Sequence, residues 1–199
     1  MSRTALRSTL LSAMFIGLLC LAGPAAADEV PMWEGIEKNA AQLKADQDFI
    51  TSVRKTTSGH LEQGAERAMQ AGWQMISSGD IEGAIRRFNQ AWLLTPEDGA
   101  IYWGFAVATG IRGDDDAVVD RFFEKTRSIM GDSSRLLCDW ARIHEQRGHF
   151  IKAHDYFTQA ATIDPKDPEP HYGLLRIGKR MGDYALVKKQ QEILYELSK

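Results

Sequence analysis

Histidines are the residues of this sequence best suited to hold a metal ion, so their spacing decides whether a metal site is expected. Three of them follow one another at intervals of five residues: His144, His149 and His154. Residues three or four apart share one face of a helix, whereas residues five apart do not. His144 precedes Glu145, but no second histidine completes the H-E-x-x-H pattern of zinc proteases. The spacing therefore predicts no metal site.

Aspartates and a cysteine are the remaining candidates for chemistry. Asp114, Asp115 and Asp116 are consecutive, but a calcium loop needs oxygen ligands at alternating positions and a distal glutamate. We expect this run to be a solvated turn. Cys138 is expected to be a small apolar residue within a helix, with a mixed disulfide to a partner as the alternative. Because G-x-S-x-G and P-loop motifs are also absent, we predict no catalytic residue and no cofactor.

The N-terminal stretch has the three parts of a secretory signal peptide. Arg3 and Arg7 supply positive charge, and an apolar run extends from Leu10 to Ala22. Three alanines at 25–27 then offer a small-residue cleavage site. We predict that residues 1–27 are removed and that the protein is periplasmic or secreted in a Gram-negative bacterium. An uncleaved membrane anchor is the alternative, although the run is short of the ~20 residues that span a bilayer.

Composition limits the kind of partner. The chain has 199 residues, of which 44% are hydrophobic and 26% charged, as is typical of a soluble globular protein. It carries 24 basic and 27 acidic residues, and this balance gives no support to nucleic-acid binding.

Leu19 precedes Cys20, and this large residue disfavours attachment of a lipid anchor at Cys20. Loss of Cys20 with the signal peptide leaves Cys138 as the single thiol, so no internal disulfide is expected. No later segment is apolar enough to span a membrane.

A repeat of about 34 residues organises the chain from residue 65 onward. Its frame is set by four glycines spaced by 34, 35 and 34 residues: Gly79, Gly113, Gly148 and Gly182. Glycine ends helices because it adopts positive φ, and the Asp or His that follows can begin a second helix. Apolar residues recur every three or four positions in 81–92 and 150–163, and Pro96 and Pro165 close these segments. The pattern predicts an all-α stack of helical hairpins.

These residues resemble the tetratricopeptide repeat, which has small residues at positions 8, 20 and 27, Gly at 15, an aromatic at 24 and Pro at 32. Counted from Ala65, the pattern is matched by Gly72, Gly79, Ala84, Phe88, Ala91 and Pro96. Counted from Ser134, it is matched by Ala141, Gly148, Ala153, Phe157, Ala160 and Pro165. Units from Gly99 and Pro168 match less well. The resemblance implies a right-handed superhelical stack of about four repeats, near residues 65–98, 99–133, 134–167 and 168–199.

Residues 28–64 precede the repeats and need a separate interpretation. A helix is predicted to start at Pro31 and Trp33. Its apolar stripe continues through Ile36, Ala40, Leu43, Phe49, Ile50 and Val53. Residues 56–59 are predicted to form a loop. We favour one or two helices that cap the first repeat, and the alternative is a mobile arm that docks on a partner.

In tetratricopeptide proteins the first helices of successive hairpins line a concave groove, so the resemblance implies which residues meet a partner. These are Met69, Trp73, Ile76, Trp103, Val107, Arg135, Arg142, Tyr172, Arg176, Lys179 and Arg180. The first half of this set is apolar and the second half is basic. We expect a partner segment with apolar anchors at one end and acidic groups, or a free C-terminal carboxylate, at the other. The alternative is that Trp73 and Trp103 are core residues covered by residues 28–60.

Together these features predict a non-enzymatic scaffold or assembly factor of the periplasm that binds a protein or peptide in its groove. The first alternative is a self-associating envelope protein whose last helix, Tyr184 to Leu197, stacks on another copy. The second is an enzyme with an unrecognised site, since a fold alone does not decide function.

Overall fold

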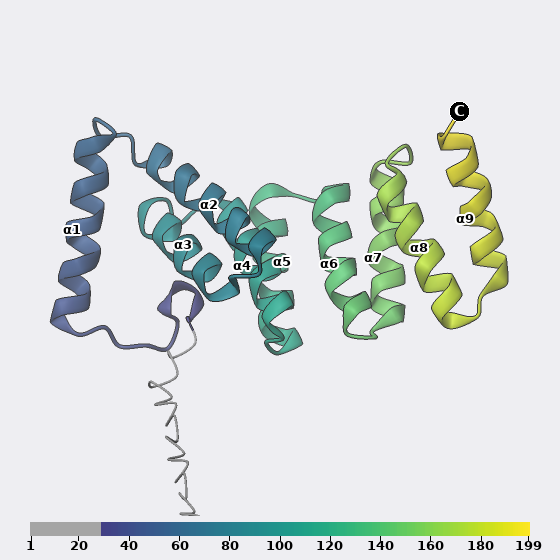
Figure 1. Ribbon diagram of the computed structural model, residues 1–199, viewed down its shortest axis with the longest axis horizontal. Coiled ribbons are helices and arrows are strands. Elements are labelled where there is room, and N and C mark those ends of the chain that lie inside the picture. The colour runs from purple at the N-terminus through teal and green to yellow at the C-terminus, as the bar shows by residue number, and fades with distance from the viewer. Residues whose placement is uncertain (1–28) are drawn as a thin grey trace, which may run out of the picture.

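The computed structural model describes residues 29–199, and in this range the chain forms helices and no strands. The predicted signal peptide lies outside the described residues. A short 3₁₀-helix, η1 (Pro31–Trp33), precedes nine α-helices: α1 (Ala40–Thr56), α2 (Leu61–Ser78), α3 (Ile81–Leu94), α4 (Gly99–Arg112), α5 (Asp116–Met130), α6 (Ser134–Gln146), α7 (Phe150–Ile163), α8 (Pro168–Met181) and α9 (Tyr184–Leu197). Figure 1 shows the stack running from α1 at one end to α9 at the other. The pairs α2–α3, α4–α5, α6–α7 and α8–α9 are antiparallel hairpins, which confirms the predicted all-α stack.

The turns inside the hairpins follow the predicted glycine–aspartate chemistry. Gly79 follows α2 with φ of 84°, and Gly182 follows α8 with φ of 71°. Side chains rarely adopt this left-handed conformation, so glycine is favoured at both positions. The carboxylates of Asp80 and Asp183 then accept backbone N–H hydrogen bonds from the first turn of the next helix. These turns fix where each second helix begins.

Close approach between helices depends on glycines that face an aromatic ring. Phe88 on α3 is fully buried between α2 and α4. A Cβ atom added to Gly72 on α2 would stand 2.5 Å from this ring, and one added to Gly104 on α4 would stand 2.6 Å away. Phe157 on α7 has the same relation to Gly173 on α8, at 2.5 Å. Each ring therefore locks its own hairpin to the next one.

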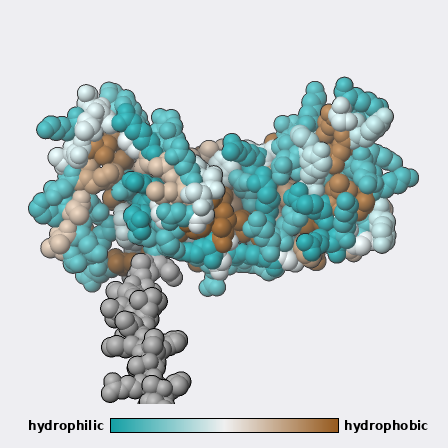
Figure 2. Space-filling view, viewed as in Figure 1, coloured by the Kyte–Doolittle hydropathy of each residue, from teal (hydrophilic) through white to brown (hydrophobic). Residues whose placement is uncertain are grey.

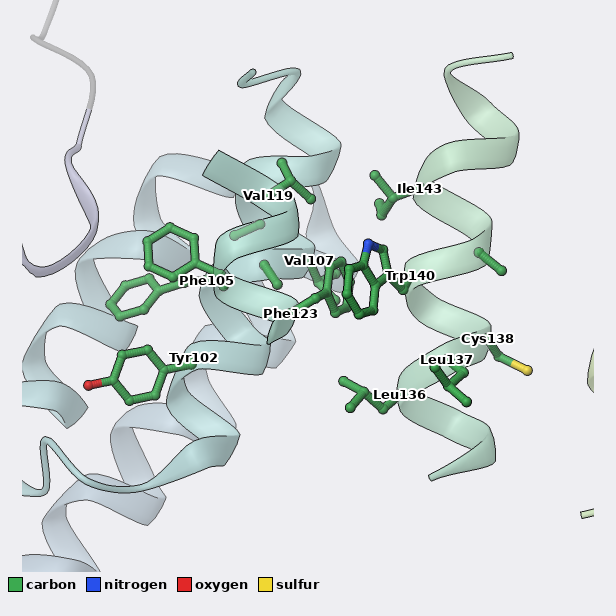
Figure 3. Close-up of a cluster of buried hydrophobic side chains, with 14 of the residues drawn as sticks. Tyr102, Phe105, Val107, Val119, Phe123, Leu136, Leu137, Cys138, Trp140 and Ile143 are labelled. Atoms are coloured by element: carbon green, nitrogen blue, oxygen red, sulfur yellow. The ribbon is translucent and has the colours of Figure 1, made fainter. Parts of the chain in front are cut away.

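The junction between α5 and α6 is built differently. These helices approach less closely than α3 and α4 or α7 and α8 do, and aromatic rings fill the space. Trp140 on α6 stacks on Phe123 of α5 with 5.0 Å between ring centroids, and on Tyr156 of α7 with 4.2 Å. Figure 3 shows Phe123 and Trp140 facing one another across the junction. Stacked rings hold α5 against α6 in the middle of the stack.

Residues 29–34, which we call the N-terminal strap, lie across α3 and α5. The side chain of Asn89 on α3 accepts a strap backbone N–H over 2.6 Å and donates to a strap carbonyl over 3.0 Å. Arg112, at the end of α4, donates to another strap carbonyl over 2.7 Å. Arg121 on α5 binds Glu34 with hydrogen bonds of 2.7 and 2.5 Å. The strap is thus fixed by side chains from the first two hairpins.

The prediction of a helix running on from Pro31 is wrong in its first part. Positive φ values of 54° and 51° at Met32 and Trp33 depart from helical geometry, and α1 begins only at Ala40. α1 packs against α2 and α3 along one edge of the stack. Its half-buried apolar residues are Phe49, Ile50 and Val53. The predicted stripe also included Ile36, which is exposed in the non-helical segment before α1, and Leu43, which is exposed on α1 itself.

Most of the molecular face in Figure 2 is hydrophilic, with apolar atoms gathered in narrow bands. Large apolar side chains are also exposed near the C-terminal end, where Tyr184 and Tyr195 of α9 are 84% and 65% exposed. No helix between residues 29 and 199 combines the length and the apolar character needed to cross a bilayer.

Candidate partner-binding groove

The first helices of the four hairpins lie side by side and form what we call the groove face. α2 contacts α4, α4 contacts α6 and α6 contacts α8. All the predicted groove residues lie on these helices: Met69, Trp73 and Ile76 on α2, Trp103 and Val107 on α4, Arg135 and Arg142 on α6, and Tyr172, Arg176, Lys179 and Arg180 on α8. Their contact with a partner stays a prediction.

Two tryptophans form the apolar part of the groove face. Trp73 lies edge-on to Phe88 with 5.6 Å between ring centroids, and edge-on to Trp103 with 6.2 Å. This is a favoured arrangement for aromatic pairs. Both tryptophans are half-buried, whereas Val107 is buried. The indoles are therefore held in place by the core and still present ring surface outside it.

The N-terminal strap lies over a different tryptophan. Trp33 packs edge-on against Trp92 of α3, with 6.5 Å between ring centroids. Within the described part of the chain, no hydrogen bond, ion pair or aromatic contact joins residues 29–60 to Trp73 or Trp103. These contacts give no support to the alternative in which this segment covers the two groove tryptophans.

Asp139 on α6 connects the apolar part to the charged part, and the sequence analysis missed it. Its carboxylate accepts the indole N–H of Trp103 over 3.0 Å and a guanidinium N–H of Arg142 over 2.6 Å. Burial raises the pKa of Asp139, and the charge of Arg142 opposes that effect. The sequence does contain a pattern that indicates this role. Asp139 lies three residues before Arg142 and four after Arg135, and side chains at these spacings are neighbours on a helix.

The predicted basic half of the groove face is a network of ion pairs. Arg142 also donates to Glu169 on α8 over 3.2 Å. Arg176 on α8 donates two hydrogen bonds to Glu145 on α6, over 3.0 and 2.9 Å. Such two-point contacts are the strong form of an arginine–carboxylate pair. They tie α6 to α8, and they leave a smaller positive surplus than the sequence suggested.

A hollow of about 380 Å³ opens where α6, the turn after it and α8 meet, and we call it the arginine hollow. It is lined by Arg142, Glu145, Gln146, Gly148, Phe150, Arg176 and Arg180. Three guanidinium groups line it. Arg142 is paired with Asp139 and Glu169, and Arg176 with Glu145, so Arg180 is the guanidinium of the hollow that has no ion pair among the described residues. A planar guanidinium matches the geometry of a carboxylate. The hollow is thus suited to an anionic group.

Cys138 lies on α6 with 1% of its surface exposed. Burial raises the pKa of its thiol to about 12. A thiol reacts as the thiolate, so the buried and protonated side chain is poorly placed for chemistry. Its surroundings are those of a small apolar core residue.

The structure corrects the spacing argument about the histidines. α6 ends at Gln146 and α7 begins at Phe150, so the chain folds back between His144 and His149. Their Nδ1 atoms lie 3.4 Å apart, and Nδ1 of His149 lies 3.0 Å from Oδ2 of Asp116. Residues five apart lie on different faces only of a continuous helix, and here a turn separates the two histidines. His154 pairs instead with Asp155 at 3.4 Å.

No protein-family model and no curated protein matches this sequence. Solved structures of the tetratricopeptide type do match. PilF of Pseudomonas aeruginosa superposes with a TM-score of 0.61 at 16% identity, covering 69% of this chain and 62% of that chain; this chain thus spans less than two thirds of PilF. MamA superposes with a TM-score of 0.59 at 13% identity, covering 82% and 96%. At these identities the likeness concerns the fold, and this chain has the tetratricopeptide-repeat fold.

Proposed function

We propose that the chain is an exported, non-enzymatic scaffold that binds an extended segment of a partner protein along the groove face. One observation carries the proposal: the surface is continuous from the tryptophans to the arginine hollow. Trp73 contacts Trp103, Trp103 contacts Asp139, and Asp139 contacts Arg142 at the hollow. Stacked repeats present extended binding surfaces of this kind.

The chemistry along this surface describes the partner. The half-buried faces of Trp73 and Trp103 suit an apolar side chain, and tryptophan is a frequent anchor of binding energy. The arginine hollow suits a carboxylate, either of an acidic side chain or of a C-terminus. Because Arg176 already holds Glu145, exposed Arg180 is the guanidinium that we assign to the incoming anion. The partner segment is therefore expected to carry an apolar anchor followed by an acidic end.

Export is the second part of the proposal and rests on the sequence of residues 1–27. Their positive start, apolar run and alanine site are the features of a signal peptide. A periplasmic or secreted location follows from cleavage after Ala27. Sequencing the N-terminus of the protein recovered from the periplasmic fraction checks this part. A mature chain beginning at Asp28 supports it, and an intact N-terminus in the cytoplasm contradicts it.

Selection from a library of displayed peptides with free C-termini tests the groove. The expected consensus is an apolar anchor followed by an acidic residue or the terminal carboxylate. A selected peptide should lose at least about tenfold in affinity, or ~1.4 kcal/mol, for Trp103→Ala and for Arg180→Glu. Lys188→Glu on α9 is the charge-matched control and should bind normally. Wild-type affinity of both groove variants for the selected peptide would contradict the proposal.

Self-association is a second candidate, favoured by the outward face of α9. A terminal repeat usually needs a polar outer face, but α9 exposes Tyr184 and Tyr195, and a hollow of about 550 Å³ beside Ile193 and Leu197 is mainly apolar. A second copy could stack on this helix. Light scattering of the purified protein separates the candidates. A monomer at about 100 µM removes this one, because its Kd would then exceed about 100 µM, which corresponds to a binding free energy weaker than about −5.5 kcal/mol.

A further inference from the structure

Three potential metal ligands meet at the junction between the second and third hairpins. Asp116 lies at the start of α5, His144 in the last turn of α6 and His149 immediately before α7. One ligand atom from each lies within 4.8 Å of the others. We propose that these three residues form a binding site for a divalent ion of the zinc type, which would join the two hairpins.

The distances between the ligand atoms fit this ion. Zinc binds histidine nitrogen and carboxylate oxygen at about 2.0–2.2 Å in tetrahedral geometry, which places ligand atoms about 3.3 Å from one another. The Nδ1 atoms of His144 and His149 are 3.4 Å apart, and Nδ1 of His149 is 3.0 Å from the Asp116 carboxylate. The remaining pair, His144 and Asp116, lies within 4.8 Å, so these side chains would have to approach by at most about 1.5 Å to reach tetrahedral spacing.

Asp120 orients the first histidine for this role. Nε2 of His144 lies 3.0 Å from Oδ1 of Asp120, and the same carboxylate accepts the indole N–H of Trp140 over 2.7 Å. With its Nε2–H donated to Asp120, neutral His144 presents the lone pair of Nδ1 to the site. Carboxylates that hold the distal nitrogen of a ligating histidine are a regular part of zinc sites.

The charges around the site are balanced. Arg147 binds the other oxygen of Asp116 and leaves Oδ2 directed at His149. Lys152 lies 3.2 Å from the second oxygen of Asp120. Two carboxylates thus accompany two cations, and two imidazole nitrogens supply the donors that zinc prefers over calcium or magnesium.

The fourth ligand has room to enter from outside. A hollow of about 490 Å³ borders the site and is lined by Asp116, Gly148, His149, Phe150, Ile151, Lys152 and Met181. Water can occupy the open position there. Because α5 and α6 approach each other less closely than the helices at the neighbouring junctions, an ion that links α5 to the α6–α7 turn would stiffen the loosest part of the stack.

Calorimetric titration of the untagged, metal-stripped protein with ZnCl₂ tests the site, with MgCl₂ as the comparison ion. We expect one Zn²⁺ per chain and a rise in Tm with added zinc. His149→Asn and Asp116→Asn should each weaken zinc binding by at least about tenfold. The first variant should still fold, because His149 makes no capping hydrogen bond and asparagine is a favoured N-cap residue.

The matched control is His154→Ala on α7, which removes another histidine paired with an aspartate. It should bind zinc like the wild type. The absorption spectrum of the Co²⁺-loaded protein adds a readout that a purely structural histidine would not change: a tetrahedral spectrum in the wild type, lost in His149→Asn. Absence of saturable zinc binding overturns the proposal, as does equal binding by the wild type and both ligand variants.

Discussion

The indole N–H of Trp103 on α4 points at the carboxylate of Asp139 on α6 and donates to it over 3.0 Å. One hydrogen bond therefore spans two repeats and joins the apolar part of the groove face to its charged part. Arg142 completes the arrangement from the other side of the carboxylate. Because Asp139 is largely shielded from water, the geometry of the groove and the stability of the fold depend on the same side chains.

Trp103→Phe should lower the free energy of unfolding, because it removes the hydrogen bond from Trp103 to Asp139. Phenylalanine keeps an aromatic ring beside Trp73 but has no N–H, so the Asp139 carboxylate loses a donor. Hydrogen bonds to charged groups contribute about 1.5–3 kcal/mol, and we expect a loss of this size in urea denaturation. Trp92→Phe is the comparison, because Trp92 donates to the neutral hydroxyl of Tyr102 over 3.3 Å. Equal losses in the two variants would contradict the role assigned to Asp139.

Asp139→Asn should change how stability depends on pH. Burial raises the pKa of Asp139 in the folded state above the unfolded value of about 3.9. Its contribution to stability is then fully present below the unfolded pKa and is lost as pH rises through the folded pKa. The asparagine variant has no such loss. Its stability relative to the wild type should therefore rise between pH 4 and pH 7 in denaturant titrations, and a constant or falling difference would show that the raised pKa is wrong.

The sequence predicted the repeat itself because each hairpin is specified locally. Gly79 and Asp80 end one helix and begin the next with atoms only a few residues apart, and the same pair of residue types recurs at Gly182 and Asp183. Phe88 could likewise be placed from its position in the motif. Such features need no knowledge of how neighbouring repeats are oriented.

Contacts between repeats were not predictable in the same way. The bond from Trp103 to Asp139 and the meeting of His144 with Asp116 depend on the rotation between successive hairpins, which single-repeat spacing does not encode. The ion pairs between α6 and α8 on the groove face could not be predicted for the same reason. The path of the strap depends on Asn89, a polar residue on α3 that no short-range pattern connects to the N-terminal segment.

Gly104→Ala should destabilise the fold although alanine is the better helix former. The added Cβ would stand 2.6 Å from the Phe88 ring, which Gly72 confines from the other side. Overpacking of this kind costs about 1–3 kcal/mol. Phe88→Leu in the same chain should relieve part of that cost, so the two changes together should cost less than their sum in urea denaturation. Strict additivity would mean that the ring does not limit the approach of α4.

Cys138 should resist thiol reagents while the protein is folded. Its pKa of about 12 and its 1% exposure leave almost no accessible thiolate at pH 8. Labelling followed by mass spectrometry of the Cys138 peptide should show slow modification in buffer and rapid modification in urea. Fast labelling under native conditions would indicate an exposed thiol and would revive the mixed-disulfide alternative.

The stacked rings at the α5–α6 junction also bear on the mechanics of the molecule. Elsewhere a ring such as Phe88 is seated against glycine, so that one helix cannot slide past the next without a collision. Phe123 and Trp140 instead meet almost flat, with 10° between their planes, and flat faces can shift laterally while staying in contact. We expect α5 and α6 to shift over one another at this plane, within the limits set by Gly110 of α4, whose close contact with Ile143 of α6 joins the same two hairpins. The pitch of the superhelix, and with it the length of segment that it can embrace, is then adjustable at one place.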